Sequence, residues 1–153
     1  GNGTTKSPHN AYNWFRDSAK GGCVEGMNNV GKCLVEGTGV IRPDVEKALV
    51  YYKRAADLDY LPAIYNYAVH LFFGKGTNIN TVDGLYWLNK AADKGSASAQ
   101  FTLGNIYREG LGNVPIDLEM AEDWYLKAIN NNDEKIAFKA MKKLKLIPGN
   151  QMQ

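Results

Sequence analysis

Histidines and cysteines are the side chains that most readily bind a transition metal or act as nucleophiles, and this chain has only two of each. His9 and His70 are about 60 residues apart, so a zinc site or catalytic pair would require the fold to bring them together. Cys33 has one basic neighbour, Lys32, and adjacent residues on a helix do not share a face. We therefore predict that Cys33 is a structural thiol and that the chain has no metal site.

Motifs for phosphate binding or hydrolysis are also missing from the sequence. None of the patterns G-x-S-x-G, H-E-x-x-H, G-x-x-x-x-G-K-[ST] or G-x-G-x-x-G occurs. The carboxylates Glu46, Asp83 and Glu119 recur at one position of a repeat, where we expect them to face solvent. We predict no catalytic residue, no enzymatic activity and no cofactor; a weak hydrolase is the least favoured alternative.

The composition is that of one ordinary globular domain. The chain has 153 residues and a mass of 16.9 kDa, with 44% hydrophobic and 22% charged residues. No run of apolar residues is long enough for a transmembrane helix, so we predict no membrane insertion. The net charge of +2 does not indicate a nucleic-acid partner. Five lysines cluster near the end of the sequence without interleaved aromatics, so this cluster does not indicate a nucleic-acid partner either. They are Lys135, Lys139, Lys142, Lys143 and Lys145.

An internal repeat of 36–37 residues organises the chain. Three G-x-G triplets begin at Gly37, Gly74 and Gly110. An aromatic anchor keeps the same spacing, and we expect its members to wedge between helices: Trp14, Tyr51, Trp87 and Trp124. Each repeat therefore has a first helical segment, helix A, before the triplet and a second, helix B, after it.

The ends of these segments carry helix-capping residues in phase with the repeat. The first glycine of each triplet suits a left-handed C-cap of helix A. We predict that helix B begins after an N-cap at Ser7, Asp44, Thr81 and Asp117. We predict that it ends in a left-handed residue at Gly22, Asp59, Gly95 and Asn132.

These signals predict an all-α fold, an α-α superhelix of about three TPR-like helix pairs with a half-repeat at each end. Ten residues of helix would separate Cys23 from Cys33 by roughly 15 Å, too far for a disulfide, so both thiols should be unpaired. The predicted boundaries are a flexible segment 1–7, one domain 8–147 and a flexible tail 148–153. Within the domain we expect helix B at 8–21, repeats at about 24–58, 61–94 and 97–131, and a last helix at 133–146.

The third repeat carries the most specific motif. Residues 97–112 read A-x-A-Q-F-x-L-G-x-x-Y-x-x-G-x-G, and residues 117–128 read D-x-x-x-A-x-x-W-Y-x-K-A. This pattern resembles the Sel1-like repeat family, and the repeat length favours that family over tetratricopeptide repeats of 34 residues. The resemblance covers about residues 8–146 and implies a right-handed superhelix that serves as an interaction scaffold. The chain lacks the paired cysteines of the family's disulfide-rich branch, which has been linked to penicillin binding and weak lactamase behaviour.

In a TPR-like superhelix the A helices line the concave face, which is where we expect a protein or peptide partner. The stripe opposite the expected core of each A helix supplies the candidate contacts. Its apolar middle, side-chain amides and basic end suit a peptide with acidic character near one terminus. The candidate contacts are Asn29, Lys32, Cys33, Glu36, Asn66, Val69, His70, Phe73, Thr102, Asn105, Ile106, Glu109, Lys139, Lys142 and Lys143.

Two functions of different class remain in competition. The leading one is a non-enzymatic scaffold or adaptor that holds one protein partner and is monomeric alone. The alternative is an immunity or inhibitor protein that neutralises a cognate bacterial toxin, for which a nanomolar stoichiometric complex is expected. The sequence leaves open whether the chain is part of a longer superhelix. It also leaves the compartment open, either cytoplasmic or exported with loss of a signal peptide.

Overall fold

The computed structural model describes residues 7–149 and contains eight α-helices and no strand within that range. The expected flexible ends, 1–7 and 148–153, lie outside the described residues except for positions 7, 148 and 149. The helices are α1 (Pro8–Lys20), α2 (Val24–Glu36), α3 (Val45–Asp57), α4 (Leu61–Phe73), α5 (Thr81–Asp93), α6 (Ala97–Glu109), α7 (Leu118–Ile129) and α8 (Glu134–Leu144). A short 3₁₀ turn, η1, covers Leu111–Asn113.

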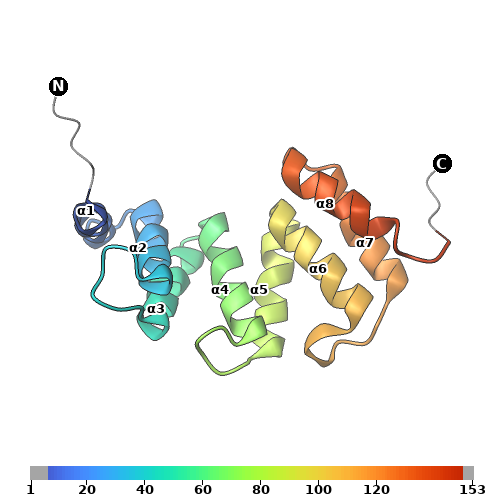
Figure 1. Ribbon diagram of the computed structural model, residues 1–153, viewed down its shortest axis with the longest axis horizontal. Coiled ribbons are helices and arrows are strands. Elements are labelled where there is room, and N and C mark those ends of the chain that lie inside the picture. Colours follow the sequence, from blue (N-terminus) through green and yellow to red (C-terminus); the bar gives the residue numbers. More distant parts are fainter. Residues whose placement is uncertain (1–6, 150–153) are drawn as a thin grey trace.

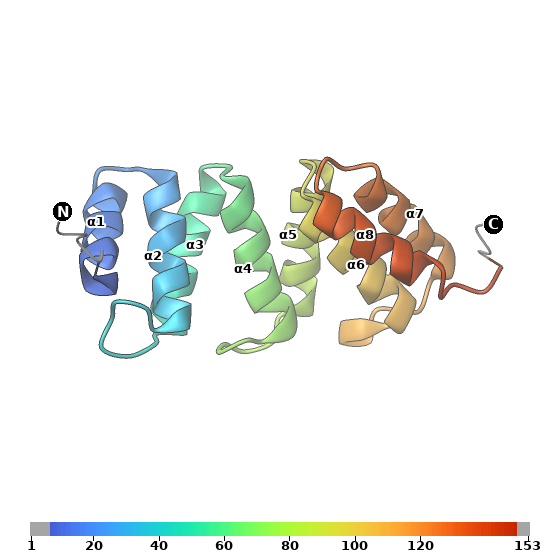
Figure 2. The ribbon, with the colours of Figure 1, turned by 45° about the horizontal axis from the view of Figure 1, so that its top comes forward.

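Each helix packs against the next one along the chain, so the molecule is an elongated α-solenoid. Figures 1 and 2 show the helices following one another along the long axis, with α1 near one end of the molecule and α8 near the other. We call α2, α4, α6 and α8 the A helices and α1, α3, α5 and α7 the B helices. From α2 to α6, every A helix packs between two B helices, and α6 also contacts α8. The predicted all-α superhelical fold is confirmed.

The core is a row of three apolar clusters between successive helices. The central cluster joins residues from α3 to α7, among them Ile64, Phe72, Leu88, Leu103 and Ile106. A second cluster fills the space from α1 to the start of α4, and a third lies between α7 and α8. Because an A helix meets B helices on two sides, its buried arc is wider than a single stripe.

The G-x-G triplets end the A helices in the predicted way. Gly37, Gly74 and Gly110 are left-handed C-caps with φ of 75°, 61° and 68°. The second glycine has a further role, because it touches the start of the preceding B helix. A Cβ atom on Gly112 would lie 2.9 Å from the Thr81 side chain and 2.7 Å from Phe72. The triplet therefore both stops the A helix and lets one repeat approach the previous one.

The predicted N-caps of the B helices are confirmed at Asp44 and Asp117, whose carboxylates accept a hydrogen bond from the backbone N–H three residues later. Ser7 occupies the N-cap position of α1, as predicted, but its side chain makes no capping bond. One predicted N-cap is wrong. At α5 the cap is Asn80, whose Oδ1 accepts from the Asp83 N–H at 3.0 Å, and Thr81 is the first helical residue. The loop before α5 is one residue shorter than the loop before α3 or α7, which shifts the cap by one position.

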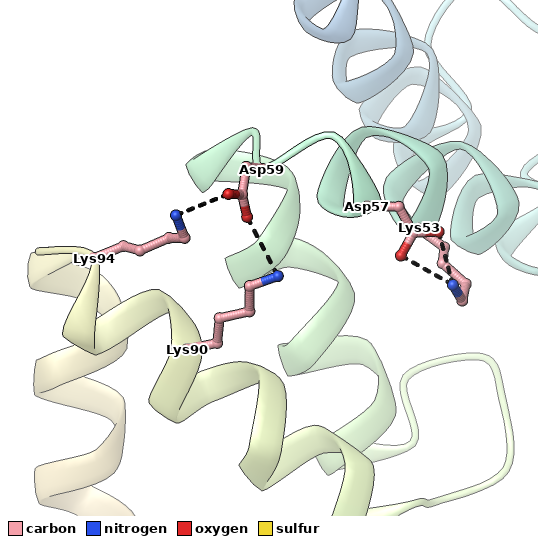
Figure 3. A network of polar contacts seen from close by, with 5 residues as sticks. All are labelled: Lys53, Asp57, Asp59, Lys90 and Lys94. Atoms are coloured by element: carbon pink, nitrogen blue, oxygen red, sulfur yellow. Dashed lines mark hydrogen bonds and ion pairs between the residues drawn. The ribbon is translucent and has the colours of Figure 1, made fainter.

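The B helices α1, α3 and α5 are each followed by the predicted left-handed residue, with positive φ at Gly22, Asp59 and Gly95. Asn132 was predicted to be the fourth and is not among the positive-φ residues. Asp59 also links two repeats, since Lys90 of α5 and Lys94, the residue after α5, approach its carboxylate at 3.2 and 3.0 Å (Figure 3). Figure 3 also shows the separate pair of Lys53 with Asp57 within α3.

The aromatic anchor packs as expected at only some of its positions. Trp124 is 6% exposed and belongs to the central cluster, and Trp87 stacks edge-on against Tyr67 of the preceding A helix. Trp14 is 67% exposed, which contradicts the predicted wedge. No A helix precedes α1 within the described residues, so no helix pair encloses this ring. Both cysteines are free, as predicted.

Candidate partner-binding groove

The A helices α4, α6 and α8 enclose a groove of about 510 Å³. This volume lies in the range of pockets that hold several ligand groups. Its lining combines apolar, hydroxyl, amide and charged side chains from three helices and two loops. The lining residues are Tyr65, Val69, Phe73, Lys75, Ser98, Phe101, Thr102, Asn105, Glu109, Leu111, Ile136, Lys139 and Lys143, which we call the groove.

Helical spacing explains why these residues converge. Tyr65, Val69 and Phe73 are four residues apart and therefore lie on one face of α4. The same spacing aligns Phe101, Asn105 and Glu109 on α6. In α8, Ile136, Lys139 and Lys143 follow at spacings of three and four residues. The three faces are brought together because α6 packs against α8 in addition to its chain neighbours.

Hydrogen bonds hold the polar side chains of the groove in place. The hydroxyl groups of Tyr65 and Thr102 are 3.3 Å apart and connect α4 to α6, and the Thr102 hydroxyl donates to the Ser98 carbonyl at 2.8 Å. The Tyr125 hydroxyl donates to Asn105 Oδ1 at 2.8 Å. Burial raises the pKa of Tyr125, so this hydroxyl keeps its proton at neutral pH. With its oxygen accepting from Tyr125, the Asn105 amide can offer its NH₂ group to a ligand.

The groove has an excess of positive charge. Three lysines and one glutamate line it, a net charge of +2. The glutamate is already compensated, because Glu109 pairs with Arg108 and lies 3.8 Å from Lys143 Nζ. Among the described residues, Lys75 and Lys139 pair with no carboxylate; the ammonium group of Lys75 lies 5.9 Å from the Phe73 ring centre. Lys75 lies in the loop after α4, and Lys139 lies on α8. Uncompensated positive charge therefore flanks α6 on both sides.

Seven of the predicted contact residues line this groove together: Val69, Phe73, Thr102, Asn105, Glu109, Lys139 and Lys143. Asn66 lines a neighbouring cavity of about 320 Å³ instead. Its amide donates to Asn28 Oδ1 at 2.9 Å, a bond that joins α4 to α2. The predicted contact on α2 is Asn29, but the residue that bonds to Asn66 is its buried neighbour Asn28.

Three residues predicted to face a partner are buried. Ile106 has no exposed surface and belongs to the central cluster. His70 is 9% exposed, and its Nδ1 lies 2.9 Å from the Lys75 carbonyl oxygen. Its ring packs against the ring of Tyr52. Cys33 occupies the equivalent position of α2 and is also buried. This position of the repeat lies within the wide buried arc that an A helix needs between two B helices.

The remaining predicted contacts lie elsewhere on the surface. Asn29, Lys32 and Glu36 are on α2, outside the lining of the groove, where the two charged side chains are exposed. Lys142 is exposed on α8, with its ammonium group 4.4 Å from the centre of the Phe138 ring.

Six residues that line the groove are not among the predicted contacts: Tyr65, Lys75, Ser98, Phe101, Leu111 and Ile136. Extending the contact stripe by one turn toward the start of each A helix would have found Tyr65 and Phe101. Phe101 also contributes to the core, because it packs beside Tyr125 with ring centres 6.0 Å apart. Lys75 belongs to a loop and Leu111 to the 3₁₀ turn η1, and the helical period does not predict the paths of these connecting segments.

Residues 7–149 contain no group of three or more metal-binding side chains. In the same part of the chain, no helix has the length and apolar character needed to span a bilayer.

Sequence comparisons find relatives for most of the chain. The family model described as Sel1 repeat matches residues 1–23, 24–60, 61–96 and 97–133. Chitin synthase regulatory factor 3 of Schizosaccharomyces pombe is 28% identical over 128 residues, which cover 82% of this chain and 14% of that protein. Chitin synthase regulatory factor 2 of the same yeast is 34% identical over 83 residues, covering 53% and 16%. The chain thus spans about one seventh of the length of these relatives.

Two solved structures share the fold. A Sel1 repeat protein from Oxalobacter formigenes superposes with a TM-score of 0.83 over 96% of this chain and 59% of that one, at 24% identity. A protective antigen of uropathogenic Escherichia coli, described as displaying an SLR fold, superposes with a TM-score of 0.80 at 31% identity. That match covers 95% of this chain and 31% of the antigen. The predicted solenoid of Sel1-like repeats is confirmed.

Proposed function

The chain belongs to the Sel1 repeat family, whose members are in general protein–protein interaction scaffolds, and on that premise we propose that it is a non-enzymatic adaptor. It holds a protein partner in the groove between α4, α6 and α8. The observation that carries this proposal is the side-chain content of the groove, where accessible apolar groups lie beside polar groups held in fixed positions.

Phe73 shows why this surface suits a partner. Its ring is 38% exposed although it stands at the end of an A helix beside the buried Phe72. Val69 is partly buried one turn earlier on the same face. A concave surface that leaves such groups accessible gains free energy when a partner removes them from water.

The composition of the groove supports binding rather than catalysis. Its lining includes no histidine or cysteine, and its single carboxylate, Glu109, is engaged by Arg108 and Lys143. General acid–base catalysis needs a titratable group held within hydrogen-bonding reach of the reacting atom and free to exchange its proton. The two yeast relatives are described as regulatory factors of an enzyme, chitin synthase.

Affinity capture from the source organism tests the proposal. The bait Phe73→Ala/Lys139→Ala alters the groove. The matched bait Tyr86→Ala/Lys47→Ala removes one exposed aromatic and one exposed lysine from B helices instead. Circular dichroism and the thermal midpoint establish that all baits are folded alike.

A protein retained by the wild type and the matched bait, and lost from the groove bait, is the expected result. Retention by the groove bait at wild-type level would contradict the assignment of the binding surface. Capture of no protein by the wild type would contradict the adaptor role. Substrate turnover by the purified chain alone would contradict its non-enzymatic character.

A further inference from the structure

We infer that the groove binds a peptide segment in which one large apolar side chain is followed closely by acidic side chains. This inference rests on the proposed function and specifies the chemistry of the partner. Three features of the groove carry it: an apolar floor, oriented hydrogen-bonding groups and uncompensated positive charge on both sides of α6.

The apolar floor indicates an anchor side chain. Val69 and Phe73 come from α4, Phe101 from α6 and Ile136 from α8, so apolar surface faces the groove from three helices. A volume of about 510 Å³ exceeds the gap left by packing faults and is large enough for side chains of a partner. A leucine or phenylalanine side chain that enters it would be enclosed on several sides, as anchor residues of interfaces are.

The polar groups indicate a polypeptide. Asn105 is held by the Tyr125 hydroxyl at 2.8 Å, which leaves its NH₂ group as a donor, and Thr102 links α4 to α6 beside it. A backbone carbonyl next to the anchor side chain is an acceptor for such an amide. Hydrogen bonds to the main chain hold extended peptides in grooves irrespective of most of their side chains.

The charges indicate acidic side chains next to the anchor. Lys75 on one side and Lys139 on the other pair with no carboxylate among residues 7–149, while Glu109 is compensated by Arg108 and Lys143. A basic peptide would bring like charge against this excess, which disfavours it. An acidic segment would meet complementary charge whichever side of α6 it crosses.

Three synthetic heptapeptides test the inference by their effect on the backbone amide resonances of the ¹⁵N-labelled chain. The probe SLFEEDS has the apolar anchor and the acidic residues. SLFKKRS keeps the anchor and reverses the charge, and SGSEEDS keeps the charge and removes the anchor. An eight-nucleotide oligothymidylate serves as the anionic competitor of another chemical class.

We expect SLFEEDS to shift the backbone amide resonances of α4, α6, α8 and the loop residues beside Lys75. Its affinity should fall as salt is added. SLFKKRS and SGSEEDS should each bind about tenfold more weakly or not at all. In the variant Lys75→Glu/Lys139→Glu, affinity for SLFEEDS should fall about tenfold and affinity for SLFKKRS should rise. The control Lys47→Glu makes the same kind of charge change on α3 and should leave SLFEEDS binding unchanged.

Equal binding of SLFEEDS and SLFKKRS would overturn the charge assignment, and equal binding of SGSEEDS would overturn the anchor. Shifts confined to α1–α3, or stronger binding of the oligonucleotide at the same residues, would overturn the peptide itself. These results are distinct from failure of the proposed function. A captured partner lost from the Phe73→Ala/Lys139→Ala bait would uphold the adaptor role even if the peptide did not bind.

Discussion

A Cβ atom on Gly104 would lie 2.5 Å from Cε1 of Tyr125, so α6 and α7 pack together at a distance that only glycine permits. The first repeat has the same relationship, with Gly31 facing the ring of Tyr52. In the second repeat Ala68 and Leu88 hold the equivalent positions, and both are fully buried. Each repeat therefore matches the size of one residue on its A helix to that of one residue on its B helix.

This matching predicts coupling between positions 104 and 125. Gly104→Ala should destabilise the protein by about 1–2 kcal/mol, because overpacking against the ring of Tyr125 outweighs the roughly 1 kcal/mol gain in helix propensity. In a Tyr125→Leu background the same change recreates the Ala68–Leu88 arrangement and should be neutral or stabilising. Urea denaturation of the four proteins measures the coupling, and additive effects would contradict it.

Two tryptophans at equivalent repeat positions should differ in their contribution to stability. Trp124→Ala should cost about 3–5 kcal/mol, since it removes a 6%-exposed ring from the central cluster. Trp14→Ala should change the free energy of unfolding by less than about 0.5 kcal/mol, since its ring is 67% exposed. Chemical denaturation compares the two variants. Equal losses would show that a further element covers Trp14.

Neighbouring residues at the start of α5 provide a test of the observed N-cap. Asn80→Ala should cost about 1 kcal/mol, because Asn80 Oδ1 accepts the Asp83 N–H. Thr81→Ala should cost less than about 0.5 kcal/mol, since Thr81 lies inside the helix and makes no capping bond. Thermal or urea unfolding distinguishes them, and a larger loss for Thr81→Ala would favour the position predicted from the repeat alignment.

The exposed carboxylate of Asp59 should make stability depend on pH. Hydrogen bonds from Lys94 and Lys90 lower the pKa of Asp59 below its ordinary value of 3.8. A lowered pKa in the folded state stabilises the protein above the unfolded-state pKa, and this contribution disappears as pH falls through the folded-state pKa. Asn tolerates the positive φ found here, so Asp59→Asn removes the charge while keeping the backbone.

The stability difference between the wild type and Asp59→Asn should be constant from neutral pH to about pH 5 and then shrink as the solution becomes more acidic. It should also shrink in about 1 M salt, because both lysines are solvent-exposed to a substantial degree. Urea denaturation over a pH series provides the measurement. A difference that stays unchanged at about pH 2 would show that the charge of Asp59 is not its source.

The amino-acid sequence by itself determined the repeat, the all-α class and most helix ends. Capping is a local matter: glycine at position 37, 74 or 110 ends an A helix through its own backbone freedom, and Asp117 caps α7 through a hydrogen bond three residues away. The period of 36–37 residues then places each helix against the next, because a helix pair must bury its apolar face on its neighbours.

Tertiary structure alone decided which side chains of an A helix are buried and which face the groove. Val69 and His70 are adjacent in sequence, yet Val69 lines the groove while His70 is buried beside Tyr52. Ile106 is buried although the stripe that contains Asn105 faces the groove. The helical period shows which residues share one face of a helix. How much of the helix surface is buried depends on how many helices pack around it. That number, and the contact of α6 with α8 that closes the groove, exist only in the assembled solenoid.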